Sequence, residues 1–115
     1  MKMEQVRGDG QVTHLALAGK LDMGGVQAIE IPFTAATAAA GKPALIDISE
    51  VIFVSSLGLR MFLSAYKALK AKGHRMLLFR PAQGVESVLI GAGFSEFVCK
   101  SADERTALDE LLTTP

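Results

Sequence analysis

Two neighbouring hydroxyl side chains, Ser55 and Ser56, are the residues whose type and position best suit chemistry. They follow the apolar run Val51–Val54 and precede residues with helical spacing, so a helix is expected to start at Ser56 or one residue from it. The first backbone N–H groups of a helix lack internal partners, and the helix dipole adds partial positive charge. A serine there can cap the helix, worth about 1 kcal/mol, or accept a phosphate without breaking the fold. The pattern alone favours the cap, because serine is a common capping residue.

Catalytic use of these serines is disfavoured by the rest of the sequence. No G-x-S-x-G elbow surrounds them, and the two histidines, His14 and His74, are far from Ser56 along the chain. A Ser-His-Asp site that uses Asp47 is a minor alternative. Asp47 fits two interpretations equally: a carboxylate satisfied by backbone donors, or a side chain beside the serine junction. A P-loop and a complete dinucleotide fingerprint are both missing. We therefore expect no enzymatic activity and no cofactor.

The elements that must position this junction alternate along the chain. Period-two and continuous apolar patterns predict strands at residues 4–7, 11–18, 44–48 (with a further apolar stretch at 51–54), 75–80 and 96–99. Apolar residues three and four apart predict helices at about residues 22–40, 56–72 and 81–90, and from 101 onward. Strands that alternate with helices imply parallel pairing. The sequence therefore predicts one α/β domain with a mixed, mostly parallel sheet of about five strands and about four helices.

Local signals refine the ends of these elements. Gly8-Asp9-Gly10 predicts a hairpin turn between the first two strands, because Asp-Gly tolerates positive φ. Pro32 predicts a kink in the first helix or a late start near it, and Gly41 predicts its C-terminal cap. Ser101–Glu104 has the pattern of a capping box, which would open the last helix.

Composition narrows the class of protein. The 115 residues suit a single domain, and the 12 basic and 12 acidic residues cancel. That balance argues against a nucleic-acid binder and gives no attraction to an anionic membrane. Cys99 is the only cysteine, so it has no internal disulfide partner, and no Cys/His cluster suggests a metal site. No apolar run is long enough to insert into a bilayer, so a cytoplasmic protein that binds another protein is expected.

Four stretches of the sequence resemble the STAS domains, and within them the stand-alone bacterial anti-sigma factor antagonists. They are Leu17–Asp22, Ala44–Ser49, Phe53–Leu59 and Leu89–Phe94. In order, they resemble an L-x-G-x-L-D opening, an apolar strand ending in D-L-S, the F-x-D-S-S/T-G-L-x switch motif and an L-x-x-x-G-L/F segment. Their order and spacing cover nearly the whole chain, which implies one STAS domain over residues 1–115.

The resemblance implies a phosphorylation switch. Such proteins bind an anti-sigma factor, often a serine kinase, and thereby free a sigma factor; phosphorylation ends the binding and a phosphatase resets it. Ser56 aligns with the phosphoacceptor, and Ser55, which replaces the acidic residue of the motif, is the second choice. The resemblance also implies a partner-binding surface made of Asp22, Ser55, Ser56, Leu57, Gly58, Leu59 and Arg60.

A second function is compatible with the same resemblance. STAS domains also serve as subunits of membrane transport complexes, for instance beside a lipid-transport ATPase. Such a subunit would use the same surface without phosphorylation.

Overall fold

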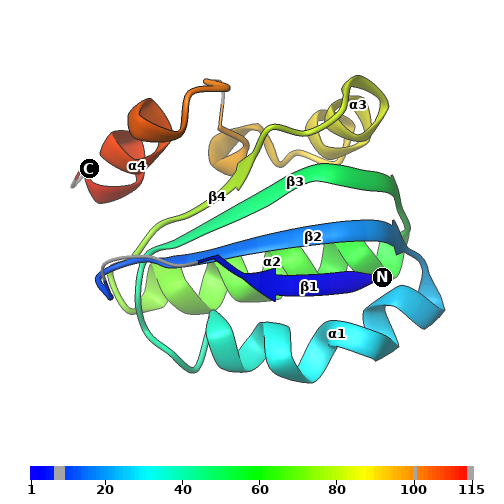
Figure 1. Cartoon of the computed structure of the whole chain (residues 1–115), viewed down its shortest axis with the longest axis horizontal. Coiled ribbons are helices and arrows are strands. Elements are labelled where there is room, and N and C mark those ends of the chain that lie inside the picture. The colour runs from blue at the N-terminus through cyan, green and yellow to red at the C-terminus, as the bar shows by residue number, and fades with distance from the viewer. Residues whose placement is uncertain (7–9, 100, 114–115) are drawn as a thin grey trace.

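The computed structural model describes residues 1–6, 10–99 and 101–113, and its strands and helices alternate as the sequence predicts (Figure 1). The elements are β1 (Lys2–Gln5), β2 (Thr13–Leu21), α1 (Met23–Ala36), β3 (Ala44–Val54), α2 (Ser56–Ala71), β4 (Met76–Phe79), α3 (Gln83–Gly91), the 3-10 helix η1 (Ser95–Phe97) and α4 (Glu104–Leu112). The predicted α/β class and the four α-helices are confirmed for the described residues. No helix among them is long and apolar enough to cross a membrane.

The sheet has four strands in the order β1-β2-β3-β4. β1 pairs with β2 in antiparallel fashion, and β2, β3 and β4 are parallel to one another. α1 and α2 are therefore the crossover helices of two consecutive βαβ units. The pairing of β2 with β3 extends to Leu21 and Val54, so these two strands end side by side.

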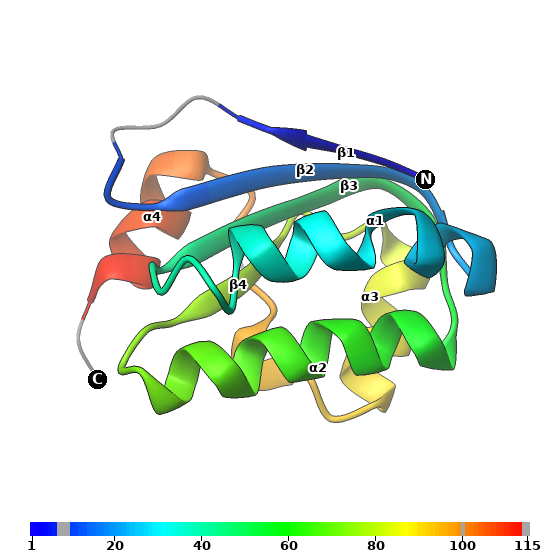
Figure 2. The ribbon, with the colours of Figure 1, turned by 90° about the horizontal axis from the view of Figure 1, so that it is seen from below.

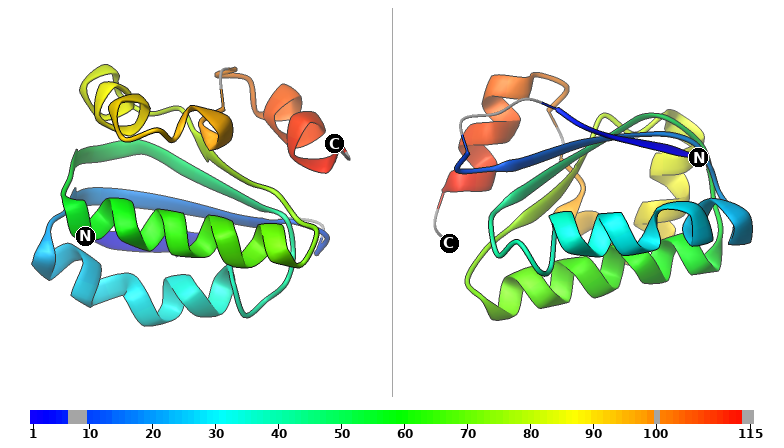
Figure 3. Two further views of the ribbon diagram at one scale, coloured as in Figure 1. Left: turned by 180° about the vertical axis from the view of Figure 1, so that it is seen from behind. Right: turned by 60° about the horizontal axis from the view of Figure 1, so that its bottom comes forward.

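Helices cover both faces of the sheet. Figures 1 and 3 show α1 and α2 on one face, and α3 and α4 on the other. η1 lies beside β4 and contacts α2, because Phe97 stacks on Tyr66. β4 is buried on both faces: Met76 and Leu78 point into the larger core cluster, whereas Leu77 and Phe79 point into a smaller one under α4. This alternation explains why its sequence is a continuous apolar run.

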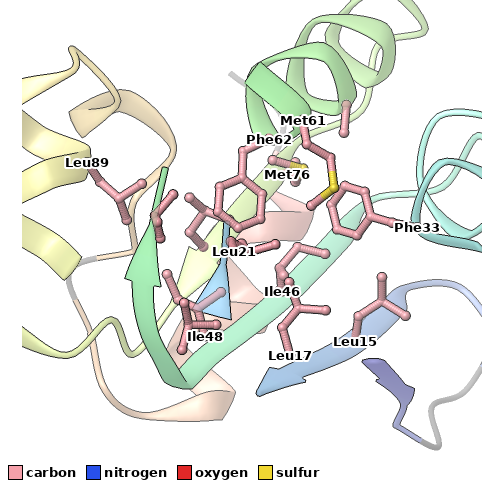
Figure 4. Packing of buried hydrophobic residues seen from close by; sticks show 14 of the residues in the cluster. Leu15, Leu17, Leu21, Phe33, Ile46, Ile48, Met61, Phe62, Met76 and Leu89 are labelled. Atoms are coloured by element: carbon pink, nitrogen blue, oxygen red, sulfur yellow. The ribbon is translucent and has the colours of Figure 1, made fainter. Parts of the chain in front are cut away.

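The larger cluster fills the space between the sheet and the two crossover helices and also includes Leu89 of α3 (Figure 4). Phe33 of α1 and Phe62 of α2 are both fully buried, and their ring centroids lie 6.0 Å apart in an edge-to-face arrangement. Leu15, Leu17 and Leu21 project from β2 towards these rings. This packing fixes α2 against the ends of β2 and β3, where the serine junction lies.

The sheet has one strand fewer than predicted. Residues 96–99 form part of η1 and a single bridge between Leu78 and Val98. The ring centroids of Phe94 and Phe97 lie 4.7 Å apart. Side chains three residues apart share a side in a 3-10 helix but lie on opposite faces of a strand. The packing of these two rings therefore favours the helical turn.

Three helix ends also differ from the sequence patterns. α1 runs through Pro32, so a late start is wrong, and it ends at Ala36 rather than at Gly41. α4 is capped by Asp103, whose carboxylate accepts hydrogen bonds from the N–H and the hydroxyl of Thr106; the predicted capping box is therefore shifted. The predicted turn at Gly8-Asp9-Gly10 lies largely outside the described residues.

Candidate functional site

The candidate site lies at the edge of the sheet where β2 and β3 end and both crossover helices begin. Figure 2 shows α1 and α2 starting at the same end of the sheet. Asp22 follows β2 directly and caps α1, and Ser55 follows β3 directly and caps α2. Because the carboxyl ends of neighbouring parallel strands share one edge, Asp22 and Ser56, 34 positions apart in the sequence, come to the same place.

Ser55 is held in place by hydrogen bonds. Its Oγ donates to the carbonyl of Leu21 at 2.7 Å and accepts from the N–H of Gly58 at 3.3 Å. Its backbone N–H donates to the same Leu21 carbonyl at 2.9 Å. The N-cap of α2 is therefore Ser55, and its hydroxyl links the end of β3 to the end of β2.

Ser56 is the first residue of α2 and is exposed to solvent. Within the described part of the chain, its hydroxyl makes no hydrogen bond. Ser55 already accepts the N–H groups of Gly58 and Leu59. The earlier N–H groups of this turn, on Ser56 and Leu57, are the unpaired donors of a helix start. The hydroxyl of Ser56 is thus free for chemistry and lies at the positive end of the dipole of a 16-residue helix.

Asp22 supplies a carboxylate at the same edge. Its Oδ1 accepts a hydrogen bond from the N–H of Gly25 at 2.8 Å, which fixes the start of α1, and the residue is exposed. A Cβ atom on Gly25 would overlap the carbonyl oxygen of Lys20, so only glycine fits there. The sequence patterns did not single out Gly25, because this close approach depends on how α1 folds back on β2.

The predicted partner-binding residues differ in exposure. Ser56 is exposed and Leu57 is 36% exposed, whereas Gly58 is buried and Leu59 packs partly against the core. Arg60 lies one turn after Ser56, at the spacing that places both residues on one face of the helix. Gly58 and Leu59 therefore position this surface, and Ser56, Leu57 and Arg60 present it.

Two further apolar side chains are exposed at this edge. Met23, the first residue of α1, is 61% exposed, and Phe53, next to the end of β3, is 48% exposed. Sequence reasoning missed both as surface residues, because an apolar residue beside a strand or helix is normally assigned to the core. With Leu57, they give this edge of the sheet three exposed apolar side chains.

Asp47 does not belong to the candidate site. Asp47 lies in the middle of β3, and its carboxylate accepts hydrogen bonds from Arg80 and from the N–H of Ser49, both at 2.9 Å. Burial alone would raise the pKa of Asp47, but the hydrogen bonds from Ser49 and Arg80 outweigh it and lower that pKa. Asp47 is thus a structural carboxylate.

A Ser-His-Asp site is also ruled out by position. His14 pairs with Leu45 near the start of β3, and His74 lies two residues before the start of β4. At about 3.3 Å per residue, the nine residues from Leu45 to Val54 separate His14 from the serines by roughly 30 Å. Among the described residues, no group of His, Cys, Asp and Glu side chains could hold a metal ion.

Comparison of the chain with known proteins identifies a matching family. Residues 4–99 match the family model described as Mlab, STAS domain. No curated protein matches the chain.

Solved structures share the fold at low sequence identity. The unphosphorylated anti-sigma factor antagonist SpoIIAA is 20% identical, with a TM-score of 0.79 over 95% of both chains. The Bacillus cell fate determinant SpoIIAA in its phosphorylated form is 19% identical, with a TM-score of 0.73 over 95% of this chain and 98% of that one. An anti-sigma factor antagonist from Mycobacterium paratuberculosis is 20% identical, with a TM-score of 0.79 over 97% of this chain and 96% of that one.

Proposed function

The chain belongs to the STAS domain family, and on that premise we propose that it is an anti-sigma factor antagonist switched by phosphorylation of Ser56. In its unmodified form it binds a kinase-type anti-sigma factor through the edge formed by the starts of α1 and α2. The kinase transfers a phosphate to Ser56, the complex dissociates, and a phosphatase restores the hydroxyl. The cycle takes place in the cytoplasm and needs no cofactor bound to this chain.

The difference between the two serines carries the proposal. The hydroxyl proton of Ser55 is donated to the Leu21 carbonyl, so modification of Ser55 would break the contact between β2 and α2. The hydroxyl of Ser56 is exposed, and a phosphate there would meet the unpaired N–H groups of the first turn. Phosphorylation of Ser56 therefore leaves the fold intact and changes only the surface.

The surroundings of Ser56 explain how one phosphate could end binding. A partner that covers Met23, Phe53 and Leu57 would bury apolar side chains next to Ser56. Phosphorylation adds about −1.5 to −2 charges at that point. Desolvation of these charges inside an apolar contact would cost roughly 3 kcal/mol or more, and each ~1.4 kcal/mol weakens the affinity tenfold. The carboxylate of Asp22 at the same edge is an added site of contact with the partner.

The structural neighbours support this cycle by analogy. SpoIIAA, which has the same fold, has been solved in unphosphorylated and phosphorylated forms. A domain of this shape can thus carry a phosphate and stay folded.

The test uses the full chain with a cognate kinase-type anti-sigma factor and ATP. Mass spectrometry should locate the phosphate on Ser56, and titration calorimetry should show that Ser56→Ala still binds the kinase without being modified. Ser56→Asp should bind at least about tenfold more weakly, because it places a charge in the contact. Unchanged affinity of Ser56→Asp, or a phosphate transferred equally well to Ser56→Ala, would contradict the proposal.

Ser55→Ala is the matched control. It removes the cap and the bond to Leu21, so the free energy of unfolding should fall by about 1 kcal/mol. Ser56 should nevertheless be phosphorylated in this variant. If the modification disappears from a folded Ser55→Ala variant, Ser55 is the acceptor.

A second candidate function is compatible with the same family model, whose description, Mlab, STAS domain, does not name an anti-sigma factor antagonist. A STAS subunit of a membrane transport complex would dock the same apolar edge on its partner without phosphorylation. Neighbouring genes separate the two candidates, since one requires an anti-sigma kinase and the other transporter components. An unmodified Ser56 after incubation with the partner would favour the transport complex.

A further inference from the structure

A second hollow lies far from the serine junction, at the C-terminal end of α2. It has a volume of about 480 Å³ and is bounded by the last turns of α2, the loop before β4 and η1. This volume falls within the roughly 300–1,000 Å³ of typical ligand pockets. The groove between α1 and α2 beside Ser56 is smaller, at about 200 Å³.

Aromatic rings form one wall of this hollow. Tyr66 of α2 and Phe97 of η1 are stacked, with ring centroids 4.1 Å apart and planes inclined by 14°. Phe97 is 3% exposed and Met76 is 1% exposed, whereas Tyr66 is partly exposed. The outer side of Tyr66, which Phe97 supports from behind, is therefore a flat and apolar surface of the kind on which a planar group packs.

Cationic side chains surround that wall. Lys70 and Arg75 line the hollow together with His74, and Glu96 is the single carboxylate among the lining residues. The guanidinium of Arg75 is held in place because its Nη1 donates to the Glu110 carbonyl at 2.7 Å. The lining thus has an excess of positive charge and several N–H donors, a combination that suits an anion.

Lys70 is available to a ligand. Its Nζ lies 5.6 Å from the centroid of the Tyr66 ring and 3.7 Å from Glu96 Oε1. Both charged side chains are exposed, at 64% and 69%, so their ion pair is weak and easily exchanged. A carboxylate or phosphate on a ring stacked beside Tyr66 would compete directly with Glu96 for Lys70.

We propose that this hollow, defined by Tyr66, Lys70, His74, Arg75, Glu96 and Phe97, binds a small planar aromatic anion. The ring packs against the exposed side of Tyr66, and the anionic group pairs with Lys70 and the loop before β4. Lys70 lies 14 residues along α2 from Ser56, or about 21 Å at 1.5 Å per residue. The site is thus separate from the proposed switch and does not depend on it.

The test is an NMR titration of the unmodified full chain with naphthoate as the aromatic anion. Naphthylmethylamine, which has the same ring and the opposite charge, and cyclohexanecarboxylate, which has the charge without the aromatic ring, serve as comparison ligands. Phenyl phosphate distinguishes a phosphate from a carboxylate as the preferred anion. Saturable shifts of the Tyr66, Gly73 and Phe97 amides are expected with naphthoate, and weaker effects with the two comparison ligands.

Charge variants test whether electrostatic attraction contributes to the binding of naphthoate. Lys70→Gln should weaken naphthoate binding by about fivefold, the upper range for one exposed charge pair. Glu96→Gln should strengthen it by roughly twofold, because a competing carboxylate is removed. Lys67→Gln, an exposed lysine on the same helix outside the hollow, should leave it unchanged. Equal binding of the naphthoate and the amine, shifts centred on the α1–α2 groove, or no saturation would overturn the proposal.

Discussion

The two hydroxyl groups at the start of α2 have different contacts. Ser55 both accepts from Gly58 and donates to the Leu21 carbonyl. A carboxylate in its place could accept from the helix start but would have no proton for Leu21. Serine at this position therefore adds a contact between β2 and α2. The adjacent Ser56 can be modified without disturbing that contact.

Asp47 is the residue whose ionisation should influence stability. Its pKa in the folded protein lies below the ordinary value of 3.8, so the unfolded chain takes up this proton first as the pH falls. The stabilisation by the Asp47 carboxylate is therefore complete above the ordinary pKa of 3.8, and it is lost as the pH falls through the lower pKa of the folded protein. Asp47→Asn should lower the free energy of unfolding by about 1 kcal/mol near pH 7, and by less near pH 3.

Urea denaturation at the two pH values measures this difference. Glu50→Gln, an exposed acidic residue on the same strand, is the control and should show no such pH-dependent loss. An equal loss for Asp47→Asn at both pH values would mean that the carboxylate charge does not stabilise the fold through Arg80 and Ser49.

The roles of two residues, Ser55 and Asp47, depend on long-range contacts that could not be predicted from the sequence. The serine junction could be predicted from an apolar run, two hydroxyls and a change of period. Which serine caps the helix could not, because the contact that decides it reaches Leu21, 34 residues away. The role of Asp47 is undecided in the sequence for the same reason, since Arg80 lies 33 residues further along.

At the scale of elements, one glycine decides how closely α2 approaches the sheet. Gly58 lies in the first turn of α2, and a Cβ atom there would be 3.0 Å from Leu21 Cβ and from Val54 Cγ1. Those are the last residues of β2 and β3, so the absence of a side chain lets the helix start against both strand ends. The site thus depends on this close approach.

Gly58→Ala should therefore destabilise the protein by about 1–3 kcal/mol, the usual cost of overpacking. Alanine has a higher helix propensity than glycine by about 1 kcal/mol. A Gly→Ala substitution in a helix should therefore stabilise the protein wherever space for the methyl group is available. Gly84→Ala near the start of α3 is the matched control, since a Cβ atom there would meet nothing within 4 Å. Thermal unfolding should show a lower melting temperature for the first variant only. A stabilised Gly58→Ala would show that α2 can move away freely.

The elements themselves were predictable where one periodicity dominates. The apolar spacing of residues 59–69 identified α2, and the continuous run at residues 44–48 identified β3 as a buried strand. The prediction failed at residues 96–99, where the short apolar pattern fits either a strand or a turn. The packing of Phe94 on Phe97 decides in favour of η1, and this contact is a tertiary feature.

At the scale of the whole molecule, the proposed site lies away from the smaller of the two core clusters. The serine junction lies at the ends of β2 and β3, whereas α4 packs over Leu45 and Leu77 near the starts of β3 and β4. Alternation along the sequence was enough to predict this layered α/β arrangement. The separation of the two regions follows from parallel pairing, which collects strand starts at one edge and strand ends at the other.

This separation predicts that stability and switching can be altered independently. Leu111 of α4 is 2% exposed and packs in the cluster with Leu45, Leu77 and Phe79. Leu111→Ala should lower the free energy of unfolding by about 2–5 kcal/mol, and Leu112→Ala, at a neighbouring 49% exposed position, by less than about 0.5 kcal/mol. Denaturant titrations measure both values.

If the proposed function holds, the same two variants should bind the anti-sigma factor with the affinity of the wild type at temperatures where they are folded. Leu45 lies about 30 Å along β3 from the serine junction, at 3.3 Å per residue, and no side chain of α4 lines the edge that carries Ser56. Loss of partner affinity in a folded Leu111→Ala variant would show that the surface used for binding includes α4. Unchanged affinity, combined with a large loss of stability, would support a partner-binding surface at the edge where α1 and α2 begin.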